Sequence, residues 1–156
     1  MLEWLEATSL AASVRQATWF YPILEIIHIT GLVLVTGTAM MFDLRLLGLS
    51  KRLPVDALAQ HLLPWSRRGL FFLVIPSGFL LFMSNAVELG NDFMFWLKMF
   101  LLFAAILNAL RFHRITFKSV SGWHEFAPTP ASEKVTTVIS LTLWIAVIAC
   151  GRLLAY

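Results

Sequence analysis

The chain has 156 residues, of which 59% are hydrophobic and 13% are charged, and its mean hydropathy is +0.79. A soluble domain needs about a quarter of its residues charged to cover its surface. A chain of this length also has too little interior to hide the surplus of apolar side chains. The composition therefore excludes a water-soluble globular protein. It predicts one integral membrane domain over residues 1–156, with the lipid bilayer as its main partner.

The net charge and the single cysteine narrow the function classes further. The formal net charge is +3, from 12 Lys and Arg against 9 Asp and Glu. The basic residues cluster beside apolar segments, which indicates membrane orientation and argues against nucleic-acid binding. The lone Cys150 excludes an intrachain disulfide and a cysteine-based metal site.

The N-terminal segment, MLEWLEATSLAASVRQ, predicts a short helix that lies in the membrane interface. Glu3 and Glu6 stand where a secretory signal peptide would carry positive charge, and no apolar core precedes Arg15. We therefore do not expect this segment to be a cleavable signal.

Four apolar segments follow, at about residues 19–47, 66–87, 92–113 and 134–155. Each is long enough to cross a hydrocarbon core of about 30 Å as a helix. Pro54, Pro64 and two polar segments separate them, and Pro76 is expected to kink the second. The pattern predicts an all-α protein, a bundle of four transmembrane helices.

The orientation of the bundle follows from the basic residues. Nine of the 12 lie in or beside the loops that join the first to the second span and the third to the fourth: Arg45, Lys51, Arg52, Arg67, Arg68, Arg111, Arg114, Lys118 and Lys134. Loops rich in Lys and Arg stay on the cytoplasmic side. We therefore predict basic cytoplasmic loops and both termini on the outer, periplasmic side.

The first span carries a polar stripe. At 100° per residue, Glu25, His28, Thr36 and Asp43 share one helix face. An ionisable group that faces hydrocarbon costs several kcal/mol, so we expect the stripe to face the bundle interior. With both termini outside, Glu25 and His28 lie in the outer half of the membrane.

Two groups of candidate site residues result, at two depths. The outer group combines the first, third and fourth spans and is the candidate cofactor-binding or ligand-binding site: Glu25, His28, Lys98 and Arg152. The second polar layer lies at the cytoplasmic end: Asp43, Arg45, Asn108 and His113.

Several interpretations of the outer group remain open. Glu25 could pair with Lys98 or Arg152 and simply hold the helices in register. Alternatively, His28 could be an axial ligand to the iron of a b-type haem, with Lys98 and Arg152 on its propionates. No second histidine lies at that depth, so either Met83 or Met99 would supply the sixth ligand or the iron would be five-coordinate. The two cations also suit an anionic ligand, such as a lipid headgroup or a quinone.

Transport and catalysis are the other classes. A Glu–His pair inside a membrane is typical of proton relays, but a chain of this size would have to form a homo-oligomer to build a path. No nucleophile–base pair, zinc-protease motif or phosphate-binding loop is present. The sequence therefore favours a protein that is not an enzyme.

The chain contains five short motifs: ExxHxxG (25–31), DLRLLG (43–48), Lys98, LNALRFH (107–113) and GRLLAY (151–156). In combination they resemble an uncharacterised family of four-helix bacterial inner-membrane proteins, a domain of unknown function. The resemblance implies a bacterial inner membrane and a four-span bundle, and it brings no activity with it. The first span is also distantly similar to copper-resistance and cytochrome-b-type membrane proteins, which use histidines on transmembrane helices.

The sequence thus predicts a multi-pass inner-membrane protein whose interior polar cluster binds a cofactor or small ligand, with b-type haem the leading single candidate. The alternatives are a structural or accessory subunit of a larger membrane complex and a small oligomeric transporter or proton relay.

Overall fold

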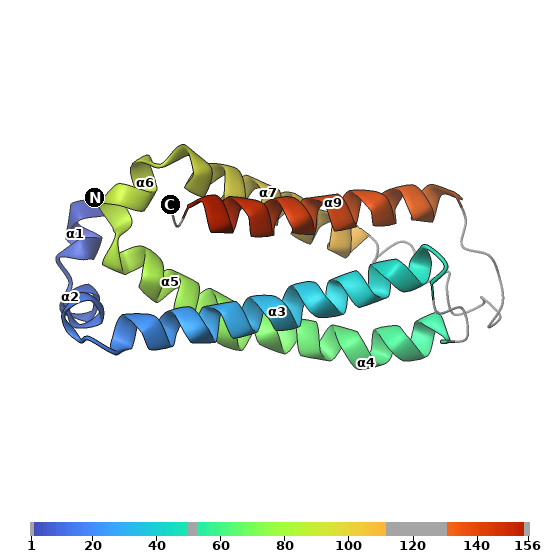
Figure 1. Ribbon diagram of the computed structural model, residues 1–156, viewed down its shortest axis with the longest axis horizontal. Helices are drawn as coiled ribbons and strands as arrows, with labels where there is room; N and C mark the ends of the chain where they lie inside the picture. Colours follow the sequence, from blue (N-terminus) through green and yellow to red (C-terminus); the bar gives the residue numbers. More distant parts are fainter. Residues whose placement is uncertain (1, 50–52, 112–130, 155–156) are drawn as a thin grey trace.

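The computed structural model describes residues 2–49, 53–111 and 131–154, and these ranges are helical with short connections (Figure 1). Short helices α1 (Leu2–Glu6), α2 (Ser9–Gln16) and α6 (Ala86–Asn91) accompany long ones. The long helices are α3 (Phe20–Leu46), α7 (Phe93–Arg111), α9 (Ala131–Leu153) and the continuous run of α4 (Val55–Arg68), η1 (Gly69–Val74) and α5 (Ile75–Ser84).

Four of these helices are long and apolar enough to cross a membrane: Phe20–Leu46, Ala57–Ser84, Phe93–Arg111 and Lys134–Leu153. The predicted all-α fold with four spanning helices is therefore confirmed. Large apolar side chains such as Phe72, Trp96 and Phe100 point outward from these helices, as expected where the solvent is lipid. The four helices suggest a multi-pass membrane protein.

The second long helix begins earlier than the sequence suggests, because Pro64 lies inside α4 and does not break it. The expected irregularity at Pro76 takes the form of a π-helix, η1, that ends two residues before this proline. Proline has no N–H to donate to the preceding turn and its ring crowds the carbonyl there. A wider π turn relieves both problems, and the Ser77 hydroxyl donates a hydrogen bond to the Leu73 carbonyl.

The long helices form two antiparallel pairs (Figure 1). In one pair α3 packs along α4, η1 and α5, and in the other α7 packs along α9. Contacts between α3 and α9 join the pairs, around a core of Val35, Val74, Ala105 and Trp144. We call the end where α3 and α7 finish the connecting end, and the end where α3 begins and α9 finishes the terminal end.

Helices α1, α2 and α6 lie at the terminal end (Figure 1). The predicted single N-terminal helix is in fact two, because Thr8 caps α2 by accepting a hydrogen bond from the Ala11 N–H. The Arg15 guanidinium donates to the carbonyls of Ser84 (3.0 Å) and Glu6 (2.8 Å), which fastens α2 to the end of α5 and to α1. The N-terminal segment is thus a folded part of the bundle.

Helices α3 and η1 approach each other closely at Gly31 on α3. A β-carbon there would lie 2.7 Å from the Leu73 Cβ and 2.9 Å from the Val74 Cγ2, whereas a β-carbon at Gly37 would meet no heavy atom within 4 Å. Small residues allow this kind of close contact between membrane helices. Gly31 therefore sets the spacing between α3 and η1.

These two glycines provide a matched test of the packing. We expect Gly31→Ala to lower the free energy of unfolding by about 1–3 kcal/mol, because the added methyl pushes η1 away. Gly37→Ala should be neutral or stabilising by up to about 1 kcal/mol, because alanine favours the helix. Unfolding of the purified variants in mild detergent, followed by tryptophan fluorescence, measures both. Equal effects at the two positions would contradict the described packing.

Candidate functional site

The polar stripe of α3 is covered at one end and exposed at the other. Thr36 and Asp43 are only 6% and 7% exposed, whereas Glu25 is exposed. Helix α9 covers α3 toward the connecting end and separates from it toward the terminal end (Figure 1). The expectation that the whole stripe is interior is therefore wrong for Glu25, because the helix that buries Asp43 has moved away at its level.

Of the four residues of the outer group, His28 and Lys98 interact electrostatically, whereas Glu25 and Arg152 are exposed. His28 is half-buried against α5, Lys98 is half-buried beside Gly151, and Arg152 is exposed on α9. Within the described part of the chain Glu25 forms no ion pair. Glu25 therefore does not form the ion pair with Lys98 or Arg152 that could have held the helices in register.

The surroundings of His28 account for it as a packing residue. Its Nδ1 lies 3.0 Å from the Ser77 Oγ, and a β-carbon at Gly78 would lie 2.9 Å from the ring Cε1. The ring thus fills the space that Gly78 leaves on α5. In the described ranges no group of three or more His, Cys, Asp or Glu side chains could hold a metal ion. Nothing in this environment points to haem iron.

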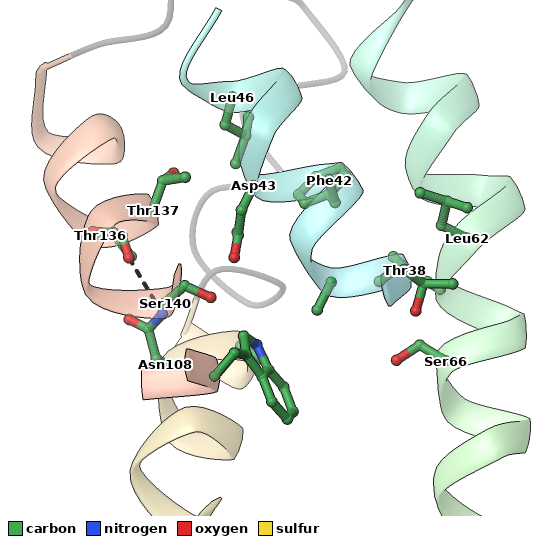
Figure 2. A pocket seen from close by; sticks show the side chains of 14 residues that line it. Thr38, Phe42, Asp43, Leu46, Leu62, Ser66, Asn108, Thr136, Thr137 and Ser140 are labelled. Carbon is green, nitrogen blue, oxygen red and sulfur yellow. Dashed lines mark hydrogen bonds between the residues drawn. The ribbon is translucent and has the colours of Figure 1, made fainter. Parts of the chain in front are cut away.

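A cavity lies near the connecting end, where α3, α4, α7 and α9 meet (Figure 2). Its volume is about 100 Å³, and half of its 14 lining residues are polar and half apolar. The polar ones are Thr38, Asp43, Ser66, Asn108, Thr136, Thr137 and Ser140, and the apolar ones are Ala39, Phe42, Leu46, Leu62, Leu63, Ala109 and Trp144. A cavity of about 150 Å³ is known to accept benzene, so this one matches a small molecule or a few waters.

Asp43 is the charged group of this cavity. Its side chain points into the space between the helices, and Ser140 lies beside its carboxylate (Figure 2). The Oδ2 atom is buried and has no hydrogen-bond partner among the described residues. A buried carboxylate oxygen without a partner is costly. The cavity therefore has an unmet demand for a positive charge or a hydrogen-bond donor.

The first turns of α9 supply the polar wall opposite Asp43. The Asn108 Nδ2 donates to the Thr136 carbonyl over 3.4 Å, which ties α7 to α9 at this level (Figure 2). Thr136 and Thr137 are buried. The site is therefore built at the junction of the two helix pairs.

The second polar layer is only partly assembled as the sequence predicts. Asp43 and Asn108 line the same cavity. Arg45 does not join them, because two residues turn a helix by about 200°; its Nε donates instead to the Leu53 carbonyl at 2.6 Å. It thereby holds the connection from α3 to α4. His113 lies outside the described residues.

Sequence reasoning missed the hydroxyl groups of α9. The residues that line the cavity from α9 are spaced at intervals of three, four and seven or eight: Thr136, Thr137, Ser140 and Trp144. This spacing places them on one face of a helix. Applied to the fourth span, the phase argument that was used for the first would have found this face.

A double-mutant cycle tests the packing role of His28. We expect His28→Ala and Ser77→Ala to be coupled by about 0.6 kcal/mol in unfolding free energy, the average for hydrogen bonds between membrane helices. His28→Ala and Ser84→Ala form the control pair and should be additive, since Ser84 bonds within its own helix, to the Leu81 carbonyl. Additivity in both cycles would remove the His28–Ser77 interaction from the stability of the fold.

Comparison with curated proteins and with solved structures finds no match. The distant similarity to copper-resistance and cytochrome-b-type proteins therefore gains no support. A family model described as a family of unknown function (DUF6644) matches residues 1–156, the whole chain. This protein belongs to that family.

Proposed function

We propose that this protein is a membrane-embedded binding protein that takes a small, positively charged ligand into the cavity at Asp43. The observation that carries the proposal is the buried Oδ2 of Asp43, which has no partner among the described residues and faces a partly open cavity of about 100 Å³. A cation in this space would satisfy the carboxylate oxygen that the described residues leave without a partner.

The energetics favour a ligand at this position. An isolated carboxylate in a medium of low dielectric constant costs several kcal/mol, and a nearby positive charge offsets that cost more effectively there than in water. Asn108 and the hydroxyls of Thr38, Ser66 and Ser140 line the same cavity. They provide polar groups around a bound cation without adding a second charge.

The outer group supports a ligand less well. Glu25 is exposed, and His28 is occupied by Ser77 and packed on Gly78. The b-type haem that the sequence favoured would need the Nε2 of His28 as its iron ligand and an open space for the porphyrin beside that ring. We therefore assign the binding role to the connecting end. A purely structural role for both polar groups remains the competing function.

The bilayer and its orientation belong to the same proposal. We place the protein in a bacterial inner membrane with the connecting end on the cytoplasmic side, because the basic residues gather beside that end. The ligand would then enter the bundle from the cytoplasmic half of the membrane. A homo-oligomer or a larger membrane complex is compatible with this arrangement and is not needed for the cavity.

The first experiment measures how cations stabilise the protein and whether this effect needs the carboxylate of Asp43. We expect chloride salts of different cations, compared at constant ionic strength, to give different melting temperatures for the wild-type protein in mild detergent. A ligand at 100 times its Kd adds about 2.7 kcal/mol, and each kcal/mol raises Tm by about 2–4 °C. Asp43→Asn should remove the differences between cations.

Glu25→Gln is the matched control, since it removes an exposed carboxylate from the same helix. It should keep the wild-type response to cations. If the two variants respond alike, or if no cation has an effect that depends on Asp43, the proposed function fails and the structural role stands.

Orientation is tested by labelling cysteines from outside the cell. In a Cys150→Ala background, Ser13→Cys lies at the terminal end and Gln60→Cys at the connecting end, and both positions are exposed. A thiol reagent that does not cross membranes should label the first in intact spheroplasts and the second only after lysis. The opposite result would reverse the proposed orientation.

A further inference from the structure

We infer that the ligand of the Asp43 cavity is a small organic ammonium ion, with Asp43 as its counter-charge and Trp144 as an aromatic wall. This inference rests on the proposed function and names the class of ligand that the site selects.

The composition of the lining argues against a divalent metal ion. Calcium takes six to eight oxygen ligands and magnesium requires a nearly ideal octahedron of oxygens. The cavity offers one carboxylate beside neutral hydroxyl and amide groups, and in the described ranges no group of three or more His, Cys, Asp or Glu side chains could hold a metal ion. Leu46, Leu62 and Leu63 form another part of the lining. A hydrated metal ion would place its water against these leucines.

An organic ammonium ion can contact both the polar and the apolar side chains of the lining. Its charged nitrogen can face the Asp43 carboxylate, and its alkyl groups can cover the apolar side chains of α4. The gain is larger than for a bare ion, because the alkyl surface is removed from water at the same time. A lining with polar and apolar side chains thus matches a ligand that has both a charge and alkyl groups.

Two aromatic residues strengthen this assignment. Trp144 on α9 and Phe42 on α3 line the cavity, and both are buried. Tryptophan is the best aromatic partner for a cation, and sites for quaternary ammonium groups are commonly built from such rings. The carboxylate and the indole come from different helices of the two pairs, so the ligand lies between them.

The volume limits the size of the ligand. A cavity of about 100 Å³ is smaller than the roughly 150 Å³ that accepts benzene. We therefore expect the cavity itself to accommodate ions from methylammonium to tetramethylammonium.

The decisive measurement compares charge and shape in one titration. Tetramethylammonium chloride, sodium chloride, potassium chloride and tert-butanol are titrated into the detergent-purified full chain by isothermal titration calorimetry. tert-Butanol has a similar size and no charge. We expect tetramethylammonium to bind with at least tenfold higher affinity than the other three, and Asp43→Asn to abolish its binding.

Two tryptophan variants test the aromatic wall. Trp144→Leu should weaken tetramethylammonium binding about tenfold, whereas Trp65→Leu should leave it unchanged. Trp65 is exposed on α4, where it stacks with Arg68 outside the cavity. If Trp144→Leu does not fold, Trp144→Phe keeps a ring in place and should show an intermediate affinity. Unchanged affinity in the folded variant would overturn the role of the indole.

The remaining outcomes separate the two proposals. Binding of sodium or potassium that depends on Asp43 and equals that of tetramethylammonium would overturn the ammonium assignment and leave the proposed function intact. Equal binding of tert-butanol would overturn both, since charge would then be irrelevant. Absence of any binding that depends on Asp43 would also overturn both.

Discussion

The contact of Gly31 with η1 is the constraint on which the rest of the bundle depends. Because glycine has no side chain, α3 approaches Leu73 and Val74 at a distance that no β-carbon would permit. This places the second long helix firmly along one face of α3 and brings Ser77 within reach of His28. The other face of α3 is left for α9. Because of this close contact, His28 on α3 finds a hydrogen-bond partner in the helix that packs along it.

The different environments of Glu25 and Asp43 follow from the same geometry. Both residues lie on one stripe of α3, five turns apart. Because α9 covers this stripe only toward the connecting end, Asp43 is enclosed and Glu25 is exposed. One helix therefore carries one carboxylate at the exposed surface and one that meets only protein and whatever occupies the cavity. Only Asp43 has a buried carboxylate oxygen without a partner among the described residues, which a ligand could provide.

Sequence reasoning was reliable wherever one helix by itself decides the outcome. Length and hydropathy identified four spanning helices, and helical phase put Thr36 and Asp43 on one face, where both are buried. It was less reliable where two helices must be placed relative to each other. Nothing in the residues around Glu25 reveals that α9 separates from α3 at that level. The neighbours Asp43 and Arg45 were likewise assigned to one layer, although they point to opposite sides of α3.

The position of the cavity also has a mechanical consequence. Its lining comes from α3 and α4 of one pair and from α7 and α9 of the other, while contacts between α3 and α9 join the pairs. A ligand held by Asp43 on one side and Trp144 on the other would add a second link at the connecting end. Because a ligand that binds only the folded arrangement stabilises it by mass action, occupancy would strengthen the association of the two pairs. The mixed lining then has two roles, because its polar and apolar side chains contact the ligand and come from both helix pairs.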